Sequence, residues 1–290
     1  MDCIFNVSKL VKEIVKEILQ SKQDTINLND YCISKLKCNY PRLSDLEIND
    51  KLDEIVEKVT FHINKRNEYR KNRDITPEYE FNTYPPKVLF RYSVKHKEPQ
   101  LISYLRKQNK VLLKAINDMS WQSFEYLCKH LLKINGVDPI KLTKVNQEGI
   151  DFLGLYNLGN YGSSVIIPRN FKLKIVGQVK HYFNKIKPRQ VRAFDTYCKD
   201  VKNEEKDIVK DFPEWFTKAK IPVLGIFMTT SDFTKASSRY VKKEWIILRN
   251  GEQIVENLIQ SHYSKDWVKN KDGHLSFDKT LFLEFFEEER

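Results

Sequence analysis

Two patterns of hydrophobic residues follow each other along this 290-residue chain, and the change between them limits the fold it can adopt. The N-terminal stretches SKLVKEIVKEILQ, YCISKLK and LSDLEINDKLDEIVEKVTFHINKR place apolar side chains at the spacing of helices. From residue 101 onward, short apolar runs typical of strands alternate with helical stretches. Strands that alternate with crossover helices predict an α/β sheet covered by helices. We therefore expect a mainly helical first part and an α/β second part.

Residues 68–100 separate the two patterns and contain four of the prolines, Pro77, Pro85, Pro86 and Pro99, without helical periodicity. We place the domain boundary near residue 100 and allow a short hairpin within this segment. The predicted division is residues 1–100, a helical domain; residues 101–262, the α/β domain; and residues 263–290, an acidic and aromatic extension. Three helices with a hairpin suit a winged-helix domain that recognises DNA, and they also suit helical bundles that serve other purposes.

Capping residues and apolar runs give the expected elements in more detail. Ser8 is the expected cap of the first helix, and Asn29 or Asp30 that of the second. In the second part, one helix is expected in LISYLRKQNKVLLKAI and another in SWQSFEYLCKHLLKING, where Gly136 ends it. Strands follow at GIDFLGLY and LKIVGQVKHY, then a long helix from Pro188, strands at IPVLGIFMTT and WIILRN, and a helix at GEQIVENLIQ.

The net charge of +11 is concentrated in the middle of the chain. Residues 101–250 carry 27 basic and 14 acidic side chains, whereas residues 251–290 carry 5 and 9. The 43 residues between Asp151 and Asp195 contain eight basic side chains and no acidic one. A solvated basic face is one explanation, and a polyanionic partner such as nucleic acid is the one we favour.

Composition argues against several other classes. No apolar run reaches the length of a membrane span, and the charges within MDCIFNVSKLVKEIVKE are unlike those of a signal peptide. We expect a cytoplasmic protein without membrane contact. The five cysteines form no C-x-x-C pair, so we expect reduced thiols rather than disulfides or structural zinc. No G-x-x-x-x-G-K-[ST] loop is present, which predicts that no ATP is required.

Four side chains could meet at one edge of the expected sheet. Gln178 and Lys180 lie two residues apart at the end of the strand KLKIVGQVKHY, so they share one face. Asp151 opens the preceding strand, and pairing of the two strands would bring it beside them. Glu125, on the helix before, could reach the same place. Oxygen ligands with an adjacent ammonium predict a site for a hard cation such as Mg²⁺.

This arrangement suits hydrolysis of a phosphodiester. Mg²⁺ needs few protein ligands and keeps positions for water and a phosphate oxygen. We expect Asp151, Gln178 and the carbonyl of Val179 as ligands, with Glu125 as a supporting acid, and Lys180 as the cation that positions the attacking water. Because Gln178 offers an amide in place of a carboxylate, we predict a weaker affinity for the metal. Singly, each residue has an ordinary explanation, such as a turn cap or a solvated charge.

These residues carry a resemblance to a known family. The segments WQSFEYLCKHLLKINGV, QEGIDFLGL, GQVKHY, RQVRAFDTY, GIFMTTSDFTKAS and ILRNGEQIVENLI, in this order within residues 120–260, resemble the catalytic domain of the Mrr-like restriction endonucleases. This family is a branch of the PD-(D/E)xK nucleases in which Q-x-K replaces the usual motif. The segment YNLGNYGSSVIIPRNFKLK, with the insertion at residues 156–171, departs from the family by its length. It could contact DNA or extend a hairpin.

The resemblance implies a restriction-endonuclease-like mixed sheet flanked by helices and Mg²⁺-dependent cleavage of DNA, with Mn²⁺ able to substitute. It also implies restriction of foreign or modified DNA and recognition by an N-terminal winged-helix domain. Double-stranded DNA is the expected substrate, and two strand scissions predict a homodimer. The alternatives are a repair or junction-resolving nuclease, and a DNA-sensing subunit that does not cleave.

Other residues are candidates for contact with the DNA backbone. These are Lys185, Lys187, Arg189, Arg192, Thr230 and Ser231. The hydroxyls of Thr229, Thr230 or Ser231 in TTSDFT could bind a phosphate or cap the next helix, and Arg192 could form a surface ion pair instead. His181 should point to the face opposite Lys180, so we expect it to pack or to support a neighbouring residue of the site rather than to act as a general base. The aromatic residues of LSFDKTLFLEFFEEER should pack against their own chain or a second copy.

Overall fold

The computed structural model describes residues 6–82, 87–143, 149–158, 171–261, 266–271 and 273–287. Several residues discussed above lie outside these ranges, namely Pro85, Pro86 and positions 159–170 of the insertion. The chain forms two compact units, residues 1–107 and residues 108–290. The boundary near residue 100 and the separate C-terminal extension remain predictions. No helix within the described ranges has both the length and the apolar character that crossing a membrane requires.

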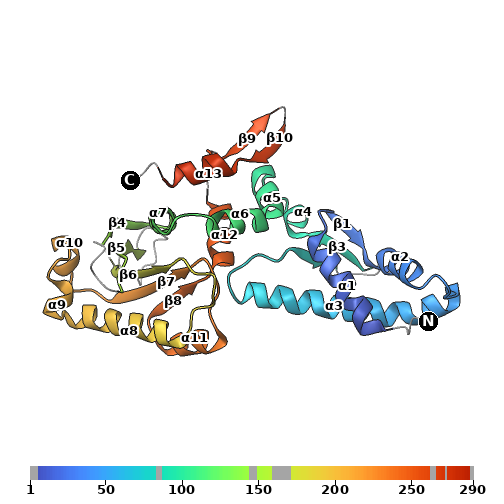
Figure 1. The fold of residues 1–290 in the computed structure, drawn as a ribbon, viewed down its shortest axis with the longest axis horizontal. Helices are drawn as coiled ribbons and strands as arrows, with labels where there is room; N and C mark the ends of the chain where they lie inside the picture. The colour runs from blue at the N-terminus through green and yellow to red at the C-terminus, as the bar shows by residue number, and fades with distance from the viewer. Residues whose placement is uncertain are drawn as a thin grey trace. The chain divides into compact units, whose positions relative to one another are not determined.

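The first unit is mainly helical, as expected (Figure 1). Its elements, in order, are α1 (Val7–Gln20), β1 (Thr25–Asn27), α2 (Leu28–Asn39), α3 (Asp45–Lys71), β2 (Tyr79–Phe81), β3 (Val88–Arg91), α4 (Tyr92–Lys95) and α5 (Gln100–Lys107). The predicted caps were wrong. Asn6 caps α1 in place of Ser8, and Asn27 caps α2 in place of Asn29 or Asp30, since each accepts a hydrogen bond from the first helical turn.

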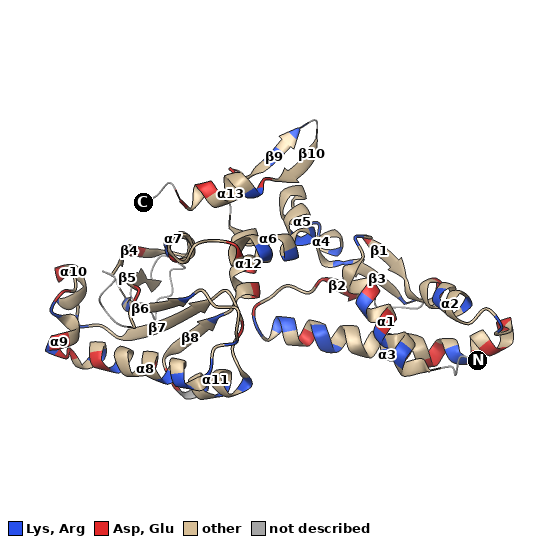
Figure 2. Cartoon of the chain, viewed as in Figure 1, with Lys and Arg blue, Asp and Glu red and all other residues tan. Residues whose placement is uncertain are grey.

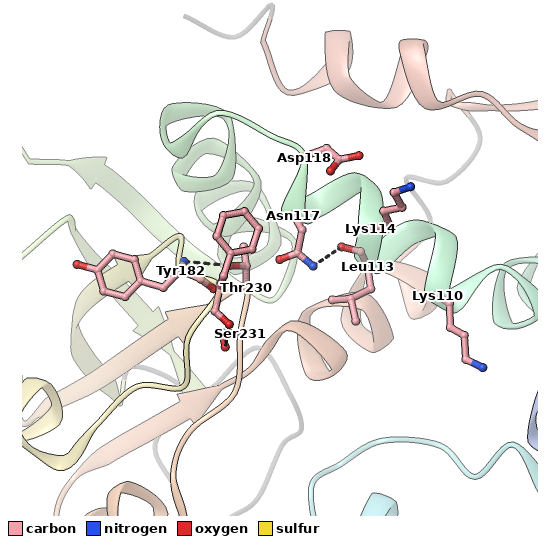
Figure 3. A pocket seen from close by; sticks show the side chains of 9 residues that line it. Lys110, Leu113, Lys114, Asn117, Asp118, Tyr182, Thr230 and Ser231 are labelled. Atoms are coloured by element: carbon pink, nitrogen blue, oxygen red, sulfur yellow. Dashed lines mark hydrogen bonds between the residues drawn. The ribbon is translucent and has the colours of Figure 1, made fainter. Parts of the chain in front are cut away.

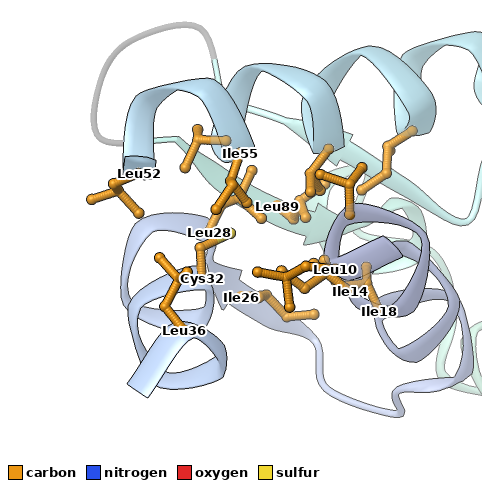
Figure 4. Close-up of a cluster of buried hydrophobic side chains, with 14 of the residues drawn as sticks. Leu10, Ile14, Ile18, Ile26, Leu28, Cys32, Leu36, Leu52, Ile55 and Leu89 are labelled. Carbon is orange, nitrogen blue, oxygen red and sulfur yellow. The ribbon is translucent and has the colours of Figure 1, made fainter. Parts of the chain in front are cut away.

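Three short antiparallel strands complete this unit in the order β1-β3-β2, so β3 pairs with both others. The hairpin allowed by the sequence is β2–β3. The core lies between the three long helices and this sheet, as Figure 4 shows. Leu10, Ile14 and Ile18 come from α1, Ile55 from α3 and Leu89 from β3, and all are buried. Apolar residues at helical spacing thus supply the burial that holds the unit together.

The second unit contains a five-stranded mixed sheet in the order β4-β5-β6-β7-β8. The strands are β4 (Val137–Leu142), β5 (Phe152–Asn157), β6 (Lys172–Lys180), β7 (Val223–Thr229) and β8 (Ile246–Arg249). β5 is antiparallel to β4 and β6, whereas β6, β7 and β8 are parallel. This mixed sheet flanked by helices confirms the predicted fold class. The strand β4 was not expected from the sequence.

Helices cover both faces of this sheet (Figure 1). The helices up to β8 are α6 (Asn109–Asn117), α7 (Trp121–Ile134), α8 (Pro188–Asn203), α9 (Lys206–Val209), α10 (Glu214–Thr217) and α11 (Lys235–Tyr240), followed by the 3₁₀ turn η2 (Val241–Lys243). On one face, α8 packs on β7 and buries Val176, Phe194 and Phe227. On the other, α7 contacts β4 and β6. The helix expected over residues 101–116 is divided, because Gln108 caps α6 after α5 has ended.

The C-terminal part adds α12 (Gly251–Gln260), the hairpin β9 (Val268–Lys271) with β10 (His274–Phe277), and α13 (Lys279–Phe285). Its aromatic residues pack within their own chain, which was one of the two expected alternatives, the other being packing against a second copy. Trp267 is fully buried and contacts Phe282 edge to face, with ring centroids 5.1 Å apart. His130 of α7 contacts the rings of Phe285 and Phe286. The hairpin and α13 were not expected from the sequence, which showed only an aromatic stripe there.

Candidate active site

Asp151 occupies the last position before β5 and is fixed by two hydrogen bonds to β6. Its backbone nitrogen donates to the carbonyl of Gly177 over 2.8 Å. Its Oδ2 atom accepts a hydrogen bond from the backbone nitrogen of Val179 over 2.6 Å. Gly149, two residues earlier, has a φ of +87°, which brings the chain into the strand in a conformation that side chains other than glycine rarely adopt. The carboxylate of Asp151 therefore lies against the end of β6.

The end of β6 carries Gln178 and Lys180. Because β5 and β6 are antiparallel, with Phe152 opposite Gly177, Asp151 comes beside this end. The strand β7 pairs on the other side, with Lys180 opposite Thr229, whose hydroxyl donates to the Lys180 carbonyl over 2.8 Å. Gln178 is 6% exposed, while Lys180 is partly exposed. Within the described residues, Lys180 forms no ion pair, so its ammonium remains available to a ligand.

The glycine at position 177 leaves room for an aromatic ring beside the site. A Cβ atom at Gly177 would lie 1.7 Å from Cζ of Phe152, so no larger residue fits without displacing the ring. Phe152 is itself fully buried. Close packing at this pair holds β5 and β6 in the register that brings Asp151 to β6.

Glu125 of α7 is electrostatically coupled to the same group. The pKa of its carboxyl is raised to about 7, mainly by burial and also by the Asp151 carboxylate, whereas Lys180 lowers it. Burial also raises the pKa of Asp151, against the opposing effects of the Val179 amide and of Lys180. Such interactions require proximity. The structure therefore brings Glu125, Asp151 and Lys180 together.

The donor atoms at this place fit a hard divalent cation. Asp151, Glu125, the Gln178 amide and the Val179 carbonyl all offer oxygen, which Mg²⁺ and Mn²⁺ prefer. Both carboxyls are partly buried and have raised pKa values, so their charged forms are disfavoured, and a bound cation would stabilise those charged forms. Across the described ranges, no three His, Cys, Asp or Glu side chains gather closely enough to hold a metal. A cation here would thus rely on the amide and the backbone carbonyl besides the two carboxylates.

The predicted DNA-binding cations lie on the loop after β6 and at the start of α8. Lys185, Lys187, Arg189 and Arg192 are all exposed. Lys185 forms an ion pair with Asp232 over 3.2 Å. The guanidinium of Arg192 lies 5.5 Å from the centre of the Tyr240 ring. Lys187 and Arg189 form no ion pair within the described part of the chain, so they are better placed to bind a phosphate.

Thr230 and Ser231 hold the loop after β6 against the end of β7. The Thr230 hydroxyl donates to the Tyr182 carbonyl and accepts from the Tyr182 amide, over 3.0 and 3.2 Å. The Ser231 hydroxyl donates to the carbonyl of Phe183 over 3.1 Å. The next helix, α11, is capped by Thr234 rather than by these hydroxyls. Each hydroxyl thus donates its proton within the protein, and a phosphate would have to compete for it.

A pocket of about 450 Å³ opens next to this loop (Figure 3). Its walls include residues of α6 on one side and of the loops after β6 and β7 on the other, namely Lys110, Lys114, Tyr182, Phe183, Thr230 and Ser231. We call it the α6 pocket. Sequence reasoning did not point to the two lysines or the two aromatic residues. The available signal was the pair of aromatic residues that directly follows Lys180 and His181.

His181 packs as expected. Its ring lies edge to face on Phe124, with centroids 5.6 Å apart, and its Nε2 atom lies 3.3 Å from the carbonyl oxygen of Ile116. These contacts place His181 toward α6 and α7 rather than beside Lys180.

Comparison with known proteins identifies this part of the chain. Residues 116–258 match the Mrr_cat family model, which describes a restriction endonuclease. The α/β unit therefore contains a restriction endonuclease domain. This segment belongs to the Mrr-like family of such domains, as the sequence resemblance implied.

Solved structures of three restriction endonucleases also align with the chain. MspJI in complex with a 27-mer oligonucleotide has 16% identity and a TM-score of 0.39, and the alignment covers 67% of this chain and 38% of that chain. The DNA modification-dependent restriction endonuclease AspBHI has 15% identity and a TM-score of 0.40, with 63% of this chain and 40% of that chain covered. FokI bound to DNA has 11% identity and a TM-score of 0.40, with 87% of this chain and 44% of that chain covered. The chain spans less than half the length of each. No curated protein matches the sequence.

Proposed function

We propose that the chain is a metal-dependent DNA endonuclease of the restriction type, which hydrolyses phosphodiester bonds in foreign, and in some cases modified, double-stranded DNA. The observation that supports this most is the grouping at the end of β6. There, Asp151 is hydrogen-bonded to Val179, and the charges of Asp151 and Lys180 both act on Glu125. The family of residues 116–258 consists of restriction endonucleases, which makes DNA the substrate to test first.

Each side chain has a distinct part in the proposed reaction. Asp151, Gln178 and the Val179 carbonyl would hold Mg²⁺, or Mn²⁺ in its place, with Glu125 as a supporting acid. When bound, the ion supplies Lewis-acid stabilisation of the charge that develops on the phosphate. Lys180 positions the attacking water and offsets the same charge through its ammonium group.

Basic side chains near this site suit the backbone of DNA. Lys187 and Arg189 lie at the start of α8, directly after the loop that follows β6. Together with Lys185 and Arg192, they would neutralise phosphates on either side of the cut. Figure 2 shows the Lys and Arg residues along the chain.

For the first unit, we propose recognition of DNA by a winged-helix domain. Three helices and a three-stranded sheet with the hairpin β2–β3 support this assignment. Phe61, Lys65 and Tyr69 on α3 are exposed, and with Arg73 just beyond its end they form a row at four-residue spacing in which cations lie over aromatic rings. Lys65 lies 5.8 Å from the Phe61 ring centre, and the Arg73 guanidinium lies 4.4 Å from that of Tyr69. Aromatic rings interleaved with cations are suited to nucleic-acid contact.

Cleavage of a panel of DNA substrates tests the proposal. We expect the full chain, with Mg²⁺ added, to cleave plasmid or methylated plasmid DNA, and to do so without ATP. Because both strands must be cut, we expect a homodimer as the active form. We also propose that the protein acts in the cytoplasm. A preference for branched DNA would favour a junction-resolving or repair nuclease instead. Binding without cleavage of any substrate, over a full Mg²⁺ and Mn²⁺ titration, would favour a sensing subunit.

A further inference from the structure

An exposed aromatic side chain stands on the loop that leaves the proposed catalytic strand. Phe183 is 84% exposed, more than any other large apolar residue in the described ranges, and the neighbouring Tyr182 is 44% exposed. Single exposed apolar residues are common on protein surfaces and need no function. Phe183 differs in two respects, since its backbone is held firmly and its ring borders the α6 pocket.

The loop is fixed at several successive residues. Thr230 binds both the amide and the carbonyl of Tyr182, and Ser231 binds the carbonyl of Phe183. Further along, the amide of Ile186 donates to the carbonyl of Asp232 over 2.8 Å. An apolar ring held in water by an ordered backbone loses little conformational entropy when a ligand binds it.

The opposite wall of the pocket is positively charged. Lys110 and Lys114 lie one turn apart on α6, and neither forms an ion pair within the described part of the chain. The acidic residue of this wall, Asp118, is already paired with Lys279 over 2.7 Å. The wall itself is well supported, because a Cβ atom added to Gly251 would lie 2.8 Å from a methyl carbon of Leu113.

A ligand that fits both walls needs a planar apolar surface and a negative charge. A nucleotide has both, because its base can stack on an aromatic ring and its phosphate can meet the lysines. The pocket volume falls within the range of about 300–1,000 Å³ that is usual for small-ligand sites. Bases inside a duplex have no free face, so the nucleotide must be unstacked from its neighbours.

We propose that the α6 pocket holds an unstacked nucleotide of the substrate strand, with its base on Phe183 and its phosphate near Lys110 and Lys114. This assignment rests on the proposed nuclease function in one respect, namely that the bound strand is DNA. Tyr182 is two residues beyond Lys180, so the nucleotide would lie close to the phosphate that is cut. The pocket should then bind a strand that contains unpaired nucleotides more tightly than it binds an uninterrupted duplex.

Binding measurements with the full chain test this directly. The Lys180→Ala protein serves as the parent, so that DNA is not consumed, and fluorescence anisotropy reports affinity for a single-stranded oligodeoxyadenylate. Phe183→Ala should weaken binding at least about five-fold, the lower end of the range for base stacking on an aromatic side chain. Phe183→Trp should retain it. Trp245→Ala is the matched control, because Trp245 is 67% exposed and precedes β8, at the end of the parallel strands opposite to Phe183.

Two further readouts identify the contacts. An oligonucleotide that carries 5-iodouracil should crosslink to Phe183 or Tyr182 on irradiation, as mapped by mass spectrometry. Lys110→Ala with Lys114→Ala should reduce the salt dependence of single-strand binding by about 0.7 per lost phosphate contact. Free dAMP should compete only at far higher concentration than the strand.

The outcomes separate this proposal from the nuclease function. Equal affinities for the Phe183→Ala and Trp245→Ala proteins, together with crosslinks outside the pocket, would overturn it even if DNA is cleaved. Crosslinks to Phe183 in a protein that never cleaves DNA would support the pocket and contradict the nuclease. Displacement of the strand by dAMP at equal concentration would show a site for free nucleotides and overturn the assignment to the strand.

Discussion

The Oδ2 atom of Asp151 accepts a 2.6 Å hydrogen bond from the backbone nitrogen of Val179. This bond connects the start of β5 to the Gln-x-Lys segment of β6, so the two halves of the proposed site are positioned by the backbone rather than by flexible side chains. It also uses one carboxylate oxygen and leaves Oδ1 without a hydrogen-bond donor among the described residues. That oxygen is the one we assign to the metal.

Asp151→Asn is the informative substitution at this position. Asparagine can still accept the hydrogen bond from Val179, so the variant should fold, whereas Asp151→Ala would leave that amide without its partner. We expect both Asp151→Asn and Lys180→Ala to bind DNA with nearly unchanged affinity and to lose cleavage by at least about a hundred-fold. Plasmid nicking assays and binding titrations measure the two effects. Wild-type cleavage rates in either variant would falsify the catalytic assignment.

The raised pKa of Glu125 makes two pH-dependent effects testable with Glu125→Gln. In the folded protein the carboxyl has a pKa of about 7, against an ordinary value of 4.5. If its charged form assists cleavage, the wild-type rate should increase as the pH rises through about 7. The Glu125→Gln rate should be lower and should lack this step. Single-turnover rates from pH 6 to pH 8.5 provide the comparison.

The same shift affects stability with a defined sign. Between pH 4.5 and pH 7 the unfolded chain ionises Glu125 while the folded protein keeps it protonated, so a rise in pH favours unfolding. Glu125→Gln should therefore increase the free energy of unfolding at pH 8 and have little effect at pH 4.5. Addition of Mg²⁺ should stabilise the wild type more than the variant. Denaturation curves in which the difference does not grow with pH would contradict the burial of this carboxyl.

Gly177→Ala tests the packing that sets the register of β5 and β6. The added methyl would overlap the ring of Phe152, with a Cβ position 1.7 Å from Cζ. Overpacking of this kind costs about 1–3 kcal/mol. We expect urea denaturation to show a loss of this size, and cleavage to fall as Asp151 shifts relative to β6. A second substitution, Phe152→Leu, should recover part of the stability, and no recovery would indicate another cause.

Contact of α8 with the DNA backbone predicts a change in salt dependence. Loss of one phosphate contact reduces the slope of log K against log salt by about 0.9 for duplex DNA. Arg189→Ala and Arg192→Ala should each approach this value and weaken all DNA sequences similarly. Lys218→Ala is the matched control, because its ammonium pairs with Glu214 and it precedes β7, away from the carboxyl end of the sheet. An unchanged slope in the two arginine variants would exclude α8 from the interface.

Hydrophobic spacing in the sequence predicted the α/β architecture, because apolar residues at strand or helix spacing mark the faces that are buried. The sequence also predicted that Asp151 would lie beside the end of β6, since consecutive strands usually pair. It missed β4, whose alternating exposed residues and Pro139 give a weak apolar signal. It missed the break after Lys107 as well, because apolar spacing continues across two helices that are separated by Gln108 alone.

Other features depend on contacts between distant residues and could not be predicted from local pattern. The pKa of Glu125 depends on burial under the fold and on Asp151, 26 positions later in the chain. The hydroxyls of Thr230 and Ser231 bind carbonyls of the loop after β6, which lie 48 positions earlier in the chain. The α6 pocket joins three segments that no local motif connects.

The position of β6 between two hydrogen-bonded neighbours affects how the protein responds to heat. Edge strands such as β4 and β8 can fray individually, but Gln178 and Val179 leave their places only when the sheet itself opens. Their amide protons should therefore exchange with deuterium as slowly as any in the domain. Loss of cleavage activity and loss of secondary structure, as followed by circular dichroism, should then occur in a single transition. No range of temperatures should exist in which the protein is folded but inactive.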